Sequence, residues 1–296
     1  MYNIVIPVIY RDYSFLKKTL KYVHKHLVPK KIYIITDIRF KRFLSNSVLK
    51  DNSCIVVDEN EVIDGLTINH VKDLFGKLGR DKMRAGWYYQ QFIKMAFALS
   101  DYCDTDYYLS WDSDTIPLRK IDFFDENEHP YFTMKIEHHK PYFDAIERLL
   151  GITETNKYSY IAENMMFSKA VMNELVNRIQ SNNYLKGQTW FEKIVYAIEP
   201  ETVSPMGFSE FETYGNYCLT YHPDLYIERM IPSLRRGGLI MGRFISDRLL
   251  EELCFDQATA SFEIYDRPPF PWGKISYWYA RWQRRKELII RRWFIR

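Results

Sequence analysis

The sequence predicts an α/β fold with a mostly parallel sheet flanked by helices. Short apolar runs rich in β-branched residues occupy 3–9, 30–37 and 53–60, and each has the length and composition of a buried strand. Segments with helical spacing separate the first two runs and precede a further strand-like run, Tyr107–Trp111. The order strand, helix, strand, strand, helix, strand is typical of parallel sheets in α/β proteins.

The individual elements follow from local patterns. The first helix is expected over 14–27, with Ser14 as its N-cap. Its apolar residues recur at helical spacing: Phe15, Leu16, Leu20, Val23 and Leu27. The second helix is expected in the latter half of 80–102. Later segments predict a strand at 129–136, a strand followed by a helix at 158–179, and a loop, short helix, strand and loop at 205–224.

Two regions are predicted along the chain. The proline-rich stretch 267–273 has the composition of a linker. We therefore expect one large domain, 1–266, followed by a C-terminal region, 267–296, that consists of this linker and a basic tail. No repeat of solenoid period is present.

Composition narrows the class of protein. With 296 residues, 47% of them hydrophobic, the chain is long enough to bury a sizeable core. A net charge of only +3 argues against a general nucleic-acid binder. The four cysteines form no CxxC pair, which favours a reduced, cytoplasmic protein over a disulfide scaffold or a zinc site. Neither a signal peptide nor an apolar run of roughly 18 residues is visible.

The most informative motif is Asp112-Ser113-Asp114, which ends the apolar run Tyr107–Trp111. Ligands of open α/β sheets bind at the carboxyl ends of the strands, where Asp37 and Asp58 are also expected. Paired carboxylates at such an edge suit Mg²⁺ or Mn²⁺, which keep waters and substrate phosphates as further ligands. The alternative is an Asp-Ser-Asp turn that caps the next segment.

In this context the sequence resembles glycosyltransferases of the GT-A fold. The resemblance covers roughly residues 1–230 in element order. It is carried by IVIPVIYRDYSFLKKTL, WDSDTIPL, GWYYQQFIK and GFSEFETYGNY, which are similar to segments of bacterial polysaccharide and lipopolysaccharide glycosyltransferases. The resemblance implies a Rossmann-like sheet, a nucleotide-sugar donor and a DxD motif that holds a metal on the donor diphosphate.

The resemblance also implies roles for individual residues. Asp114 would ligate Mn²⁺ or Mg²⁺, and Asp112 would complete the metal shell or contact the donor ribose. The nucleoside pocket would be lined by Pro7, Tyr10 and Asp37. The metal would neutralise the leaving nucleoside diphosphate.

Basic and polar residues before and within the second helix are candidates for donor binding. Arg80, Lys82 and Arg84 precede a helix N-terminus, an arrangement that attracts a diphosphate. Gln90 and Lys94 are one turn apart and would reach a shared ligand. The alternative for the first three is a solvated basic loop.

Acidic residues later in the chain are candidates for catalysis. Glu210 or Glu212 would be the general base of an inverting transfer, the alternative being that both occupy a helix N-terminus favoured by its dipole. His222 would complete the metal shell, or is an ordinary hydrogen-bonding histidine. Glu163 and Asn164 would touch the donor sugar or acceptor, although capping also accounts for Asn164.

The final segment, 274–296, carries eight Lys or Arg and one Glu. On a helix its tryptophans would share one face and its arginines would lie mostly opposite, the pattern of a helix on an anionic membrane surface. Packing on the body, an oligomer contact and nucleic-acid binding are the alternatives.

Together these observations predict a metal-dependent glycosyltransferase on the inner face of the cytoplasmic membrane. Its donor would be a nucleotide-diphosphate sugar, most readily a UDP-sugar, and its acceptor a saccharide or lipid-linked saccharide of cell-surface polysaccharide. Two alternatives are a noncatalytic membrane-docked scaffold and a sugar nucleotidyltransferase. The second normally has a glycine-rich loop after the first strand, and IPVIYRDYS has no glycine there.

Overall fold

The protein has a mixed α/β fold with a mostly parallel central sheet, which confirms the predicted fold class. The computed structural model describes residues 1–51, 53–153, 158–199, 206–243 and 245–266, with a few single positions beyond them. The sheet has the strand order β3-β2-β1-β4-β7. Its strands are β1 (Tyr2–Pro7), β2 (Ile32–Thr36), β3 (Cys54–Asp58), β4 (Tyr107–Trp111) and β7 (Asn164–Ser168). The first four are parallel and β7 is antiparallel to β4.

Strand β1 lies at the centre of the sheet, and most of its side chains are apolar. Ile4 pairs with Ile32 of β2 on one side and with Leu109 of β4 on the other, and all three are fully buried. Strands covered on both faces are continuous apolar runs rather than alternating ones. This is why the strands were recognisable in the sequence.

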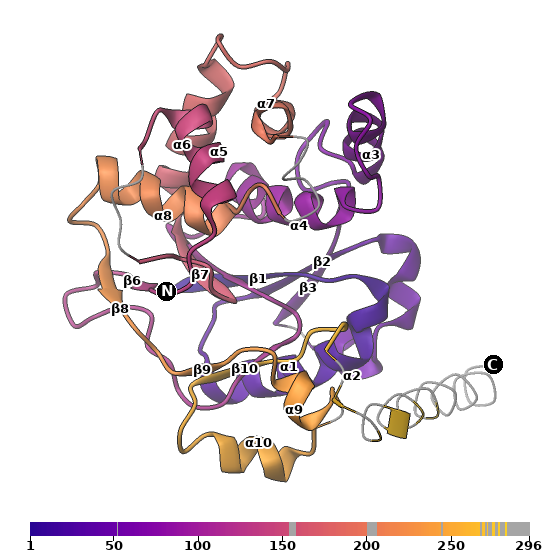
Figure 1. Ribbon diagram of the computed structural model, residues 1–296. Coiled ribbons are helices and arrows are strands. Elements are labelled where there is room, and N and C mark those ends of the chain that lie inside the picture. Colours follow the sequence, from indigo (N-terminus) through magenta and orange to yellow (C-terminus); the bar gives the residue numbers. More distant parts are fainter. Residues whose placement is uncertain are drawn as a thin grey trace.

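Helices cover both faces of the sheet (Figure 1). Those on one face are α3 (Ile68–Lys77), α4 (Ala85–Ala96), α5 (Lys140–Leu150), α6 (Lys169–Ser181), α7 (Trp190–Ala197) and α8 (Glu210–Tyr221). Those on the other are α1 (Tyr13–His26), α2 (Asn46–Leu49), α9 (Gly237–Met241) and α10 (Asp247–Leu253).

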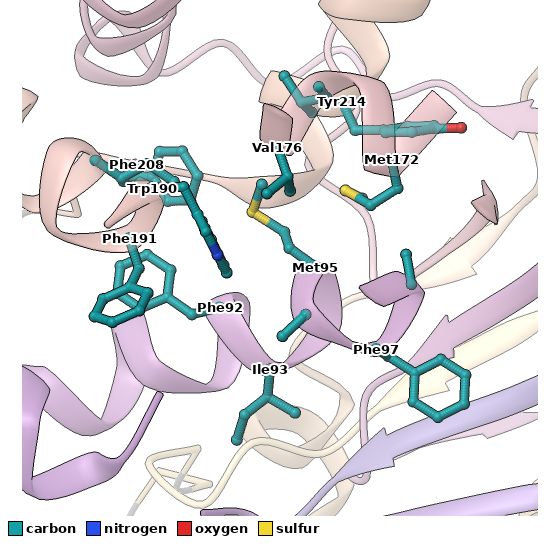
Figure 2. Close-up of a cluster of buried hydrophobic side chains, with 14 of the residues drawn as sticks. Phe92, Ile93, Met95, Phe97, Met172, Val176, Trp190, Phe191, Phe208 and Tyr214 are labelled. Carbon is teal, nitrogen blue, oxygen red and sulfur yellow. The ribbon is translucent and has the colours of Figure 1, made fainter. Parts of the chain in front are cut away.

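The larger core lies between α4 and the helices above it. Figure 2 shows Phe92, Ile93 and Met95 of α4 among side chains of α6, α7 and α8. Phe92 meets Trp190 edge to face, with ring centroids 5.8 Å apart. Aromatic pairs of this kind add about 0.5–1.5 kcal/mol beyond the burial of their area. The packing fixes α4, which carries Lys94, against the sheet.

A small second sheet brings the end of the body back to the central sheet. Its strands are β5 (Thr115–Pro117), β10 (Thr259–Ser261) and β9 (Ser233–Leu234), in the order β5-β10-β9. Strand β5 follows the DSD motif directly. It pairs with β10, whose residues come about 140 positions later in the chain. A separate pair is formed by β6 (Tyr131–Thr133) and β8 (Ile227–Arg229).

Two local predictions were wrong. Helix α8 occupies most of 205–224, where a short helix and a strand were expected. Its aromatic and small residues fit either element by composition, but Phe211, Tyr214 and Tyr217 are all buried at helical spacing. The first helix begins at Tyr13 with Asp12 as its N-cap, so Ser14 lies inside it.

Further features bear on the class of protein. All four cysteines are free thiols. Within the described residues, none of the helices combines the length and the apolar character needed to span a lipid bilayer. The predicted amphipathic segment 274–296 falls almost wholly outside the described residues.

Candidate active site

The DSD motif forms a turn at the carboxyl end of β4, held by backbone hydrogen bonds on several sides. The Asp112 amide donates to the Glu163 carbonyl at 3.0 Å, and the Phe262 amide donates to the Asp114 carbonyl at 2.9 Å. The Thr19 hydroxyl of α1 donates to the Ser113 carbonyl at 2.7 Å. Three distant segments therefore fix the position of the two carboxylates.

A buried lysine lies between two carboxylates next to this turn. Lys94 is 7% exposed, and its Nζ donates to Asp112 Oδ1 and to Glu210 Oε1, both at 2.8 Å. Burial lowers the pKa of Lys94, but the carboxylates of Asp112 and Glu210 outweigh it and raise this pKa overall. Lys94 therefore stays charged and orients Asp112, and its ammonium is not free to bind a ligand as predicted.

Asp114 differs from Asp112 because its carboxylate makes no side-chain hydrogen bond or ion pair with any described residue. Burial and repulsion from Asp112, Asp12 and Glu263 raise the pKa of Asp114 to about 8, and Arg243 opposes this in part. Burial and the neighbouring carboxylates thus disfavour the charged form of the Asp114 side chain. Such a carboxylate at a sheet edge is stabilised by a bound cation.

Two arginine-containing clusters flank the turn. Arg235 Nε lies 3.0 Å from Glu163 Oε1, Lys135 Nζ lies 3.8 Å from Glu163 Oε2, and Arg235 also pairs with Glu137. On the other side Arg243 pairs with Asp12 at the start of α1. The site therefore combines carboxylates with cations that are paired to them.

The two carboxylates fit a hard divalent cation only if water or substrate oxygens supply its remaining ligands. Within the part of the chain that the structure describes, no third Asp, Glu, His or Cys joins Asp112 and Asp114 in a group with ligand atoms all within 4.8 Å. Mg²⁺ commonly binds to one or two carboxylates and takes its other oxygens from water and substrate phosphates. Asp112 and Asp114 match that pattern.

The predicted nucleoside edge lies at the carboxyl ends of β1 and β2. Pro7 is buried at the end of β1, and the Tyr10 ring stacks on Phe40 with centroids 5.0 Å apart. Asp37 accepts hydrogen bonds from Arg39, whose side chain lowers the pKa of that carboxyl. The edge therefore presents aromatic and acidic groups together.

The three basic residues before α4 that were predicted to bind a diphosphate have different surroundings. The two terminal nitrogens of the Arg80 guanidinium donate to carbonyls at the end of α7, those of Val195 and Ile198. Lys82 is exposed and lies against Gly76, while Arg84 is the N-cap of α4. Arg80 thus ties α7 to the loop before α4, and its guanidinium is not available for a diphosphate.

The helix α4 begins more than two turns before Lys94. Gln90 is half-buried on the same helix. Because each residue rises about 1.5 Å along a helix, Arg84 lies about 15 Å from Lys94. The predicted sharing of a ligand by Gln90 and Lys94 stays a prediction.

Neither predicted base is open to an acceptor. Glu210 is 4% exposed and is held by Lys94. Glu212 is fully buried and accepts hydrogen bonds from the Ser159 hydroxyl at 2.5 Å and the Tyr160 amide at 3.0 Å. Both occupy the first turn of α8, where the helix dipole favours acids. This placement does not fit a base role for either residue.

His222 lies far from the DSD motif, whereas Asn164 lies beside it. His222 follows the last residue of α8, about 18 Å along the helix from Glu210, and pairs with Glu174 at 2.9 Å. It therefore does not complete a metal shell at Asp114. Asn164 is buried opposite Trp111 in the sheet, and its Oδ1 has no hydrogen-bond partner among the described residues.

Five further charged residues near the motif were not predicted from the sequence: Asp12, Lys135, Arg235, Arg243 and Glu263. Arg235 and Arg243 flank the glycine-containing stretch RRGGLIMGR, which was a visible signal of a loop with close backbone approach. Nothing in the sequence placed that stretch beside the DSD motif, because the contact depends on the small second sheet.

A protein-family model described as a family of unknown function, DUF6492, matches residues 8–229, well over half of the chain. The chain belongs to this family. The matched region contains the DSD motif, Lys94 and Glu210, and ends before Arg235 and Arg243. No curated protein matches the sequence.

Solved structures with a similar arrangement of elements include glycosyltransferases. One is galactosyltransferase LgtC in complex with donor and acceptor sugar analogs, with 9% sequence identity, a TM-score of 0.43 and coverage of 94% of each chain. Another is apo mouse xyloside xylosyltransferase 1, with 8% identity, a TM-score of 0.45 and coverage of 90% of this chain and 99% of that one.

Proposed function

We propose that this member of the family transfers a sugar from a nucleotide-diphosphate sugar to a saccharide or lipid-linked saccharide acceptor, with Asp112 and Asp114 holding Mg²⁺ or Mn²⁺. The observation that carries the proposal is the Asp114 carboxylate at the carboxyl end of β4, which pairs with no side chain among the described residues. It lies where parallel α/β sheets bind their ligands.

The residues of the chain have separable tasks in this proposal. Lys94 orients the Asp112 carboxylate by a hydrogen bond and neutralises part of the buried negative charge. Arg235 and Arg243, paired with Glu163 and Asp12, balance part of the negative charge beside the turn. Tyr10 and Phe40 offer an aromatic surface beside the ends of β1 and β2 for a nucleoside. A bound divalent cation would supply neutralisation of the leaving diphosphate.

The base that would deprotonate an acceptor hydroxyl needs an open carboxylate. Glu263 is exposed, lies near Asp112 and Asp114, and has a pKa raised by burial of part of its carboxyl and by Asp266. It is a better placed candidate than Glu210 or Glu212, whose carboxylates are occupied. Inversion at the anomeric carbon remains the prediction made from the sequence, and the anomeric configuration of the product tests it.

The first test is thermal stabilisation by UDP-, GDP-, CMP- and ADP-type sugar nucleotides, each with and without Mn²⁺. We expect one nucleotide to raise the melting temperature only when metal is present. A ligand at a hundred times its Kd adds about 2.7 kcal/mol of stability. Asp114→Asn should abolish the metal-dependent shift, whereas Asp144→Asn on the surface of α5 should keep it. A full shift in Asp114→Asn refutes the assignment.

Transfer itself separates an enzyme from the noncatalytic scaffold. The wild-type chain with donor and metal should release nucleoside diphosphate, by slow hydrolysis or by transfer to an added saccharide. Binding without any release, over a range of acceptors, favours the scaffold. We also propose a UDP-sugar donor, a role in polysaccharide synthesis and a location on the inner membrane surface. Binding of anionic vesicles by the full chain, compared with a chain ending at residue 273, tests the location.

A further inference from the structure

A second cluster of metal-binding side chains lies away from the DSD motif. His24 belongs to the last turn of α1, Asp51 follows α2, and Cys54 is the first residue of β3. One ligand atom from each of these three residues lies within 4.8 Å of the other two. Imidazole, carboxylate and thiol thus converge from three separate elements.

The local backbone holds two of these side chains in place. Asp51 Oδ1 accepts hydrogen bonds from the Ser53 amide at 2.9 Å and the Ser53 hydroxyl at 2.6 Å. The other oxygen, Oδ2, then faces His24 Nε2 at 2.7 Å. Cys54 pairs with Ile32 in the sheet, and its amide donates to the Asp51 carbonyl at 3.0 Å. Hydrogen bonds that orient a carboxylate in this way are typical of the residues surrounding a metal ion.

The cluster is accessible from a cavity. A hollow of about 470 Å³ between α1, α2 and the start of α10 includes His24 and Asp51 in its wall. Lysines line the same hollow, and two of them, Lys18 and Lys21, pair with Asp247. The cavity gives an ion access to His24 and Asp51.

We propose that His24, Asp51 and Cys54 bind a zinc-type transition-metal ion, with water as a fourth ligand. The combination of thiol and imidazole selects such an ion over Mg²⁺ or Mn²⁺, which prefer oxygen ligands. Ligand atoms around a tetrahedral zinc lie about 3.3–3.6 Å apart, so the His24–Asp51 contact opens slightly on binding. The Cys54 thiol gives its proton to solvent as the sulfur–metal bond forms, and thiolate and carboxylate together balance the charge of the ion.

This site is remote from the candidate active site. Cys54 begins β3 and Asp112 follows the end of β4, so the two clusters lie at opposite edges of the parallel sheet. Strands of five residues separate those edges by about 16 Å. A metal bound here would tie the end of α1 to the start of β3, and it does not depend on the function proposed above.

Calorimetric titration of the full chain, stripped with a chelator, with ZnCl₂ and separately with MnCl₂ tests the proposal. We expect one zinc ion per chain at this site, with affinity reduced about tenfold or more in Cys54→Ala and in His24→Ala, since each loses a ligand. Cys254→Ala removes the other half-buried thiol and should bind zinc as the wild type does. Asp114→Asn should also keep this zinc affinity.

Two measurements on the wild type need no variant to fold. Co²⁺ in place of zinc should produce the near-ultraviolet charge-transfer absorption of a cobalt–thiolate bond. Zinc should also slow alkylation of Cys54, but not of Cys254, in peptide mass spectra. Unchanged zinc affinity in Cys54→Ala, or the absence of both the cobalt–thiolate band and the protection of Cys54, would overturn the proposal and leave His24 and Asp51 as a contact without a metal.

Discussion

Replacing Lys94 by methionine tests how the buried charges at the site are balanced. The lysine is 7% exposed and is hydrogen-bonded to Asp112 and Glu210 at 2.8 Å each. Lys94→Met keeps the volume of the side chain but leaves Glu210, 4% exposed, without its cation. Deleting one partner of a buried pair costs about 3–5 kcal/mol, a large share of a total stability of about 5–15 kcal/mol.

The expected loss is measurable in urea unfolding followed by circular dichroism. In thermal unfolding, each kcal/mol of lost stability lowers the melting temperature of a chain of this size by about 2–4 °C. The melting temperature of Lys94→Met should therefore fall by about 10 °C. Lys94→Met combined with Glu210→Gln should be more stable than Lys94→Met alone, because the second change removes the unpaired buried charge. Lys140→Ala is the control, since Lys140 and Asp144 form an exposed pair worth at most about 0.5 kcal/mol.

Two outcomes would contradict the reasoning. One is a loss below about 1 kcal/mol in Lys94→Met, which would mean that water reaches Glu210 in the folded state. The other is a double variant no more stable than the single one, which would mean that the loss comes from packing around Phe211, whose ring lies 4.4 Å from the lysine Nζ.

Further predictions concern pH dependence and packing. Burial, together with the charges of two neighbouring aspartates, raises the pKa of Glu59 from 4.5 to about 7, so the folded chain keeps a proton that the unfolded chain loses. The stability that this proton contributes is complete below pH 4.5 and is lost as pH rises to about 7. Glu59→Gln should therefore gain up to about 3 kcal/mol relative to wild type between pH 5 and 8, less where water screens the group, and equal slopes of unfolding free energy against pH for the two proteins would contradict this. Gly215→Ala should lose about 1–3 kcal/mol in urea unfolding, because its methyl group would lie 2.2 Å from a Tyr160 ring carbon. Gly86→Ala, whose methyl group meets nothing within 4 Å in α4, should instead gain about 0.5–1 kcal/mol.

Some elements were predictable because their burial is simple. Strands β1, β2 and β4 are buried along almost their whole length, so they are nearly continuous apolar runs in the sequence. Helix α8 was predicted only in part, because residues such as Tyr214 and Tyr217 suit a strand as well as a helix. Their burial against other helices decided between the two, and that burial is a property of the tertiary structure.

The candidate site divides in the same way. The sequence by itself determined that Asp112 and Asp114 end a strand and lie at the carboxyl edge of a parallel sheet, because all parallel strands share that edge. It did not determine which charges meet them. Lys94, Arg235 and Arg243 are separated from the motif by between 18 and about 130 positions, and only the packing of α4 and the small second sheet brings them together. Since the energy between charges depends on distance and burial, tertiary structure alone decided that Asp112 is paired while Asp114 is left without a partner among the described residues.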